Sequence, residues 1–146
     1  MKRAIFPGTF DPFTKGHHSI VMRGLEVFDS VIIAIGMNSD KTPMWPLDKR
    51  LQFINELFND QSRITVETYT GLTMNYCKER NATHIIRGLR SSKDFSYEQP
   101  IAQTNRALSG IETVFFASDP ELTHISSTIV RDIAQYEGDI GSFLPD

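Results

Sequence analysis

The fold is decided by the stretch KRAIFPGTFDPFTKGH, residues 2–17. Residues 2–6 form a short, mainly apolar run that predicts a strand, and Pro7 with Gly8 ends it. Apolar side chains then recur at helical spacing over residues 17–28. A strand, a glycine-containing loop and a helix in this order indicate the first unit of an alternating α/β chain.

The alternation continues to the end of the chain. Further strands are expected over residues 31–37, 63–69, 84–87 and 113–117, and further helices over 47–58, 72–80, 94–108 and 127–137. Pro100 should kink the fourth helix or start a new one. Since no linker or repeat interrupts this pattern, we expect one domain, residues 1–146, with a doubly wound, five-stranded parallel sheet.

Ligands of such sheets bind at the carboxyl ends of the strands. We therefore expect function in the loops that follow the strands, at residues 7–17, 38–45, 69–74, 88–94 and 118–128.

Composition excludes several classes of protein. The net charge of −3 lacks the basic excess of a non-specific nucleic-acid binder. The longest strongly apolar run, residues 31–37, is far below the roughly 20 residues that span a bilayer. Cys77 is the only cysteine, and the first residues lack a signal-peptide pattern. We expect a cytoplasmic protein that binds neither nucleic acid nor membrane.

The first loop carries groups suited to an anion. Gly8 and Gly16 let the backbone approach a ligand, and the N–H groups of a helix start attract phosphate. Thr9 can donate a hydroxyl and His17 an imidazole N–H to the same anion. Only two glycines occur, so this is not the dinucleotide-binding GxGxxG pattern. A capped turn without any ligand explains the loop equally well.

Two arginines flank Gly88 after the fourth strand. Arg87 and Arg90 could both donate to a phosphate through their forked guanidinium groups. The alternative is a surface ion pair with Asp94 or Glu98.

Two more loops add polar groups. The run Ile125-Ser126-Ser127-Thr128 offers three hydroxyls at the start of the last helix. One of them caps the helix, which leaves the others for an anion unless capping is their whole role. Lys41 follows the second strand and is either a phosphate ligand or a solvated loop lysine.

These loops together supply donors and positive charge without a convincing nucleophile or base. Cys77 is expected inside a helix and buried. His18 lies about 100° around its helix from His17, so both cannot face one ligand. No histidine pair has metal-binding spacing, and we expect no metal site built by the protein. The inventory favours phosphoryl or nucleotidyl transfer, where catalysis is mainly positioning and electrostatic stabilisation.

The same motifs resemble a known family. Residues 7–12 followed by TKGH at 14–17 are similar to the nucleotidylyltransferase signature, and Thr14 in place of its first histidine resembles the bacterial phosphopantetheine adenylyltransferase family. IRGLR at 86–90 and ISST at 125–128 are similar to that family's other signatures. The resemblance implies a Rossmann-like fold, ATP with Mg²⁺, the acceptor 4′-phosphopantetheine, a homohexamer and coenzyme A as a feedback ligand.

The resemblance also implies roles for individual residues. His17 would be catalytic. The acceptor would be held by Thr9, Lys41, Thr73 and Arg87. ATP would be held by Thr9, Phe10, His17, Gly88, Leu89, Arg90, Glu98, Thr123, His124, Ile125, Ser126, Ser127, Thr128 and Ile129.

Two other functions compete with this reading. One is a nucleotidylyltransferase with another acceptor, such as nicotinamide mononucleotide or glycerol phosphate, against which Thr14 and the motif at 86–90 argue. The other is a nucleotide sensor without catalysis, which should have lost His17 or Lys41. Pro100 and Thr73 depart from the family pattern near the expected acceptor pocket.

Overall fold

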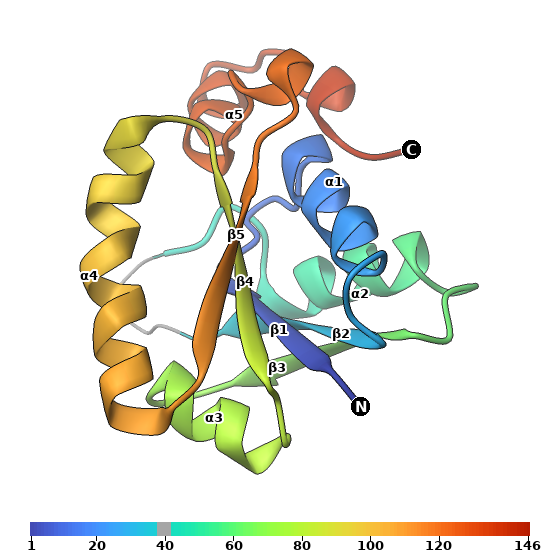
Figure 1. Cartoon of the computed structure of the whole chain (residues 1–146). Coiled ribbons are helices and arrows are strands. Elements are labelled where there is room, and N and C mark those ends of the chain that lie inside the picture. Colours follow the sequence, from blue (N-terminus) through green and yellow to red (C-terminus); the bar gives the residue numbers. More distant parts are fainter. Residues whose placement is uncertain (38–41) are drawn as a thin grey trace.

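The computed structural model describes residues 1–37 and 42–146 (Figure 1). Five parallel strands form one sheet in the order β3-β2-β1-β4-β5, which confirms the predicted α/β class. Their bounds are β1 Arg3–Gly8, β2 Ser30–Gly36, β3 Ile64–Tyr69, β4 His84–Leu89 and β5 Glu112–Ala117.

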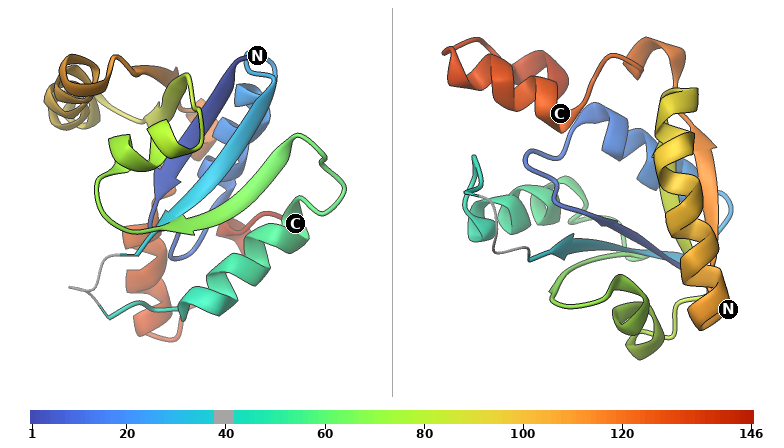
Figure 2. Two further views of the ribbon diagram at one scale, coloured as in Figure 1. Left: turned by 90° about the horizontal axis from the view of Figure 1, so that it is seen from below. Right: turned by 90° about the vertical axis from the view of Figure 1, so that its left-hand side faces the viewer.

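Helices cover both faces of the sheet, as a doubly wound fold requires. They are α1 Lys15–Gly24, α2 Leu47–Leu57, α3 Thr73–Glu79, α4 Ser92–Ser109 and α5 Ser127–Gln135, with short 3₁₀ turns at Pro120–Leu122 and Gly141–Phe143. Helices α1 and α2 lie on one face and α3 and α4 on the other (Figure 2). None of the helices in the described part of the chain is long and apolar enough to cross a bilayer.

Strand β2 shows why its sequence is almost entirely apolar. Ile33 and Ile35 point into the cluster beneath α1 and α2, while Ile32 and Ala34 point into the cluster beneath α3. All four are at most 3% exposed, because both faces of the strand are covered.

The sheet is least continuous between β1 and β4. Strand β1 pairs with β2 over six positions, from Arg3–Ser30 to Gly8–Ile35. It pairs with β4 over two positions, Ala4–His84 and Ile5–Ile85. The order of strands also reverses here, since β2 lies on one side of β1 and β4 on the other, so this is the point where ligand sites are expected.

Some boundaries differ from those predicted. Helix α1 begins at Lys15 rather than at residue 17, because Thr14 caps it, and it ends at Gly24 rather than at residue 28. Helix α4 runs from Ser92 to Ser109 as a single helix with Pro100 inside, so no new helix starts there.

Candidate active site

Two adjoining clefts open at the carboxyl ends of the strands. The α4 cleft, of about 520 Å³, is lined by the ends of β1, β2 and β3 and by one side of α4. The α5 cleft, of about 340 Å³, is lined by the loop after β1, the end of β4 and the start of α5. Both clefts share Pro7, Gly8, Thr9, Arg87 and Glu98, so ligands in the two clefts would meet at these residues.

His17 faces the α5 cleft in one fixed orientation. The backbone N–H of Thr14 donates to His17 Nδ1 over 2.9 Å, and the Thr14 hydroxyl caps the helix by accepting from the His17 N–H over 3.4 Å. Because an amide N–H can only donate, Nδ1 must be the unprotonated nitrogen. The proton of the neutral ring is therefore on Nε2.

The surroundings of His17 keep its ring neutral. Its centroid lies 5.0 Å from the ring of Phe10 and 5.3 Å from that of Phe13. Burial, and after it the positive charges of Arg87 and Arg90, lower the His17 pKa from 6.5 to about 3. At neutral pH the imidazole can thus donate one hydrogen bond, from Nε2, without carrying a charge.

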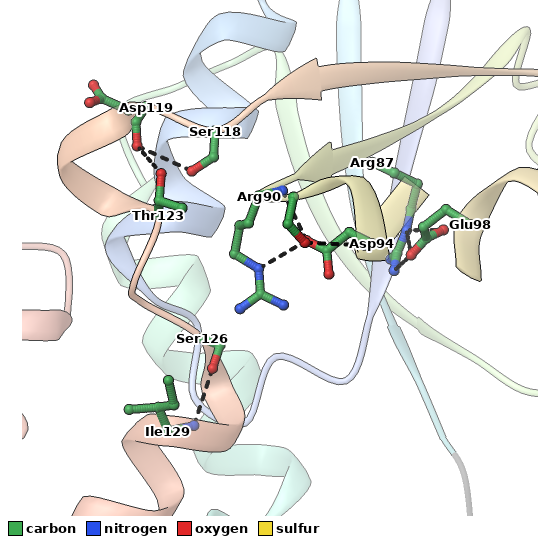
Figure 3. A network of polar contacts seen from close by, with 10 residues as sticks. Arg87, Arg90, Asp94, Glu98, Ser118, Asp119, Thr123, Ser126 and Ile129 are labelled. Atoms are coloured by element: carbon green, nitrogen blue, oxygen red, sulfur yellow. Dashed lines mark hydrogen bonds and ion pairs between the residues drawn. The ribbon is translucent and has the colours of Figure 1, made fainter. Parts of the chain in front are cut away.

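Arg87 lies in the wall that the two clefts share. Its Nη2 donates to Glu98 Oε1 over 2.6 Å, and its Nη1 donates to the Pro7 carbonyl over 2.7 Å. The sequence left open a phosphate ligand or an ion pair, and the ion pair with Glu98 forms (Figure 3). The guanidinium retains further N–H groups on Nη1 and Nη2, since each of these nitrogens carries two.

Arg90 is paired in a similar way at the end of β4. The Asp94 carboxylate accepts from the Arg90 backbone N–H over 2.9 Å and from its Nε over 3.3 Å (Figure 3). Among the described residues, neither terminal nitrogen of Arg90 has a hydrogen-bond partner, so both are available to a ligand. Asp94 itself lines the cleft, although the sequence reading gave it no binding role.

All three hydroxyls at the start of α5 form hydrogen bonds within the protein, whereas the sequence predicted that only one, the helix cap, would do so. Ser126 is the cap, accepting from the Ile129 N–H over 3.2 Å (Figure 3). Ser127 donates to the Pro12 carbonyl over 2.9 Å, and Thr128 accepts from Arg131 over 3.2 Å. The Thr128 O–H and the backbone N–H groups of Ser127 and Thr128, which have no hydrogen-bond partner among the described residues, remain able to donate into the cleft.

The structure brings most of the predicted site residues together. Those predicted for ATP that line the α5 cleft are Thr9, Phe10, His17, Gly88, Leu89, Arg90, Glu98, Ile125, Ser126, Ser127 and Thr128. Those predicted for the acceptor that line the α4 cleft are Thr9, Thr73 and Arg87. Lys41 lies outside the described residues.

Three predicted residues line neither the α4 nor the α5 cleft. The Thr123 hydroxyl donates to the Asp119 carbonyl over 3.2 Å. His124 lies edge-on to Phe143, with ring centroids 6.5 Å apart. Ile129 is 47% exposed and lines a separate hollow between α5 and residues 42–44.

On the α4 wall of its cleft, the sequence assigned a ligand to Glu98 alone. Tyr97, Ile101 and Asn105 line it, together with Tyr69, whose hydroxyl is 2.9 Å from that of Thr73. The spacing of four between 97, 101 and 105 places these residues on one helix face and could have indicated a shared surface. The wall thus presents both apolar and polar side chains to a ligand.

The two clefts define a class of chemistry. The α5 cleft offers a neutral imidazole donor, a helix start and three arginines, Arg87, Arg90 and Arg131, which together suit a polyphosphate. The shared wall offers Thr9 and Arg87 to a second anion. Two anionic substrates meeting beside preorganised donors is the arrangement of a group-transfer site.

Comparison with known proteins agrees with this class. A profile of the cytidylyltransferase-like family matches residues 5–133. The chain is 50% identical over 145 residues to a phosphopantetheine adenylyltransferase of Bacteroides fragilis, covering 99% of this chain and 97% of that one. It is 49% identical over 146 residues to the enzyme of the same name from Phocaeicola vulgatus, covering 100% and 97%.

A solved structure shows the same fold. It is a putative nicotinate-nucleotide adenylyltransferase from Vibrio parahaemolyticus, with a TM-score of 0.69 and 21% identity over 100% of this chain and 95% of that one. Fold and site thus define a nucleotidyltransferase of the cytidylyltransferase-like class. Within that class, the chain belongs to the phosphopantetheine adenylyltransferase family.

Proposed function

We propose that this chain transfers the adenylyl group of ATP to 4′-phosphopantetheine, giving dephospho-coenzyme A and pyrophosphate in a reversible reaction. This is the penultimate step of coenzyme A biosynthesis. The observation that carries the proposal is the pair of clefts that meet at Thr9 and Arg87, in a chain 50% identical to an enzyme of that name.

Each substrate has its own cleft in this proposal. ATP occupies the α5 cleft, with its phosphates beside His17, Arg90 and the start of α5. Phosphopantetheine occupies the α4 cleft, with its phosphate at Thr9 and Arg87 and its amide-containing arm along Tyr97 to Asn105. Lys41 would add a second cation to the acceptor phosphate.

The reaction needs no general base. The second pKa of a phosphate monoester is about 6, so the acceptor phosphate is largely dianionic at neutral pH. One of its oxygens attacks the α-phosphorus of ATP, the new P–O bond forms, and the bond to pyrophosphate breaks. His17 donates its Nε2–H to an α-phosphate oxygen, and this hydrogen bond strengthens as charge builds in the transition state.

Mg²⁺ fits this site as an ion carried by the nucleotide. Within residues 1–37 and 42–146, no group of three or more His, Cys, Asp or Glu side chains is arranged to hold a metal. Of the carboxylates lining the α5 cleft, Asp94 and Glu98 already accept from arginines, and Asp119 accepts from a backbone N–H over 3.0 Å. Phosphate oxygens and water would therefore be its main ligands, and the ion would stabilise the pyrophosphate leaving group.

The family resemblance supports three further parts of the proposal. We place the enzyme in the cytoplasm, as a homohexamer, with coenzyme A as a feedback ligand that competes for the α4 cleft. Sedimentation of the purified chain and inhibition of turnover by coenzyme A would check the last two.

A coupled assay of pyrophosphate release tests the function itself. With ATP and 4′-phosphopantetheine we expect turnover, and with nicotinamide mononucleotide or glycerol phosphate at least 100-fold lower kcat/KM. A preference for either of these acceptors would identify a different transferase. ATP binding without turnover on any acceptor would favour a nucleotide sensor.

A further inference from the structure

Two buried charged residues outside both clefts connect separate segments of the site. Asp11 is 3% exposed and Arg50 is 7% exposed. Within residues 1–37 and 42–146 neither forms an ion pair. A buried charge is costly unless hydrogen bonds compensate it, so their partners indicate what each residue does.

Arg50, on α2, joins the loop after β1 to the segment before α2. Its Nη1 donates to the Thr9 carbonyl over 2.9 Å, and its Nε donates to the Trp45 carbonyl over 3.0 Å. Thr9 is one of the residues that both clefts share. The rigid guanidinium fork therefore fixes the distance between residue 9 and residue 45.

Asp11 makes the complementary connection in the opposite direction. Its Oδ2 accepts from the Met44 N–H over 2.7 Å, and its Oδ1 accepts from the Trp45 N–H over 2.9 Å. Both carboxylate oxygens of Asp11 thus accept hydrogen bonds from residues 44–45, and Arg50 contacts the same turn through the Trp45 carbonyl. Four charge-assisted hydrogen bonds join residues 9–11 to residues 44–45, a unit that we call the 9–11/44–45 clamp.

Phe10, between the two clamped residues, has a backbone that needs such support. Its φ of 52° is in the left-handed region, which is unfavourable for a bulky residue without glycine's freedom. This conformation places its ring nearly perpendicular to that of His17 and over Gly8, where an added Cβ would lie 2.8 Å from the ring. The clamp and the catalytic imidazole are therefore in contact through one side chain.

We propose that Arg50 and Asp11 are positioning residues, whose clamp holds Phe10 against His17 and Thr9 at the junction of the two clefts. Neither residue touches a substrate in this arrangement. The kinetic consequence rests on the proposed function: a loosened clamp misaligns the two substrates, and a misplacement of about 1 Å can cost about 100-fold in rate.

Kinetics of Arg50→Lys test the proposal against a matched control. Lysine keeps the charge but cannot donate in a fixed fork to both carbonyls. Arg63→Lys is the control, because Arg63 also donates to two backbone carbonyls, those of Leu25 and Phe28, and lines neither cleft. We expect kcat at saturating substrates to fall at least tenfold for Arg50→Lys, with the ATP dissociation constant changed less than about threefold, and kcat of Arg63→Lys to stay within about twofold.

Circular dichroism establishes that both variants are folded. An unchanged kcat in folded Arg50→Lys would overturn the proposal. So would an equal loss of kcat in Arg63→Lys, since the effect would then be general destabilisation.

A second measurement does not depend on the reaction. In Asp11→Asn, the side chain keeps one acceptor oxygen instead of two, so at least one of the amides of Met44 and Trp45 should exchange with solvent at least tenfold faster. Trp45 is the only tryptophan of the chain, so its fluorescence should report the same change. If the wild type lacked transferase activity, the proposed function would fail, while unchanged exchange at both amides would still overturn the clamp.

Discussion

At the scale of single residues, the His17 ring is held by Thr14, whose backbone N–H donates to Nδ1 and whose hydroxyl lies 3.2 Å from the same nitrogen. The Thr14 N–H occupies Nδ1, and this leaves Nε2–H as the only donor of the neutral ring. His18 is placed quite differently, stacked on Phe58 with ring centroids 5.3 Å apart and planes 11° from parallel. The two neighbouring histidines should therefore respond differently to substitution.

We predict that His17→Ala lowers kcat by at least about 100-fold, because removing one preorganised donor to transition-state charge commonly has that effect. ATP affinity measured by calorimetry should stay near that of the wild type. His18→Ala, the control, should change kcat only a fewfold. Since neutral imidazole is the donor, kcat of the wild type should not decline between pH 7 and 8.5. A one-proton decline that is absent in the His17 variant would show that imidazolium is required instead.

The same ring makes stability depend on pH. The His17 pKa is about 3 in the folded chain, against 6.5 for an imidazole in an unfolded chain. Between these values the unfolded chain binds more protons, so the free energy of unfolding falls as pH drops below 6.5, by up to about 1.4 kcal/mol per pH unit. Above pH 6.5 both states bind the same number of protons at His17, so its neutral ring makes its full contribution to the free energy of unfolding.

Urea unfolding of wild type and His17→Gln at pH 7 and pH 5 measures this effect. Glutamine at this position still completes a capping box with Thr14, so helix α1 keeps its start. We predict that the wild type loses more stability than the variant between the two pH values. Equal losses would mean that His17 is not held neutral by its surroundings.

At the scale of elements, Pro100 is a local weakness in α4. It lies inside the helix and is exposed, so it removes one backbone hydrogen bond without gaining packing. We predict that Pro100→Ala raises the free energy of unfolding by about 1–3 kcal/mol, measured by urea unfolding. The neighbouring Gln99→Ala, also exposed, is the control and should stay within about 0.5 kcal/mol. A destabilised Pro100→Ala would indicate that the proline matches a backbone bend that α4 requires.

Helix α1 shows that apolar spacing in the sequence locates a helix but does not fix the residue at which it begins. The spacing of apolar residues located the helix from residue 17 onward, but it does not reveal the cap, since a capping box normally carries Glu or Gln at the third helical position. Here His17 takes that place and accepts from the Thr14 N–H. The residue that marks the start of the helix is the same residue that chemistry requires, and a propensity rule does not recognise it.

The predicted loops illustrate the same limit for the site. The rule that ligands bind at the carboxyl ends of strands located Thr9, His17, Arg87 and Arg90. It could not reveal Arg50, which lies within α2 and resembles a solvated helix residue in sequence. Its burial follows from the approach of α2 to the loop after β1, which is a contact between distant segments.

At the scale of the whole molecule, Cys77 can report on unfolding. It is fully buried on α3, and burial raises its pKa to about 11, so the native thiol should be inert. We predict that a thiol reagent labels it only through opening of the fold, and that ATP at about 100 times its dissociation constant slows labelling about 100-fold. Cys77→Ala should keep kcat within a fewfold and cost about 1 kcal/mol of stability. Lost activity in a folded Cys77→Ala chain would contradict a purely packing role.

The short pairing of β1 with β4 has a consequence for cooperativity. The backbone pairing of these strands ends at Ile5–Ile85. Closer to their carboxyl ends, the Arg87 side chain connects them by donating to the Pro7 carbonyl. The backbone thus forms two blocks, β1 to β3 and β4 to β5, with a seam between them. A substrate that contacts both Thr9 and Arg87 bridges this seam from one block to the other. Substrate should therefore act as a reversible crosslink between the two blocks, in addition to the hydrophobic clusters that they share, and should make their opening more cooperative.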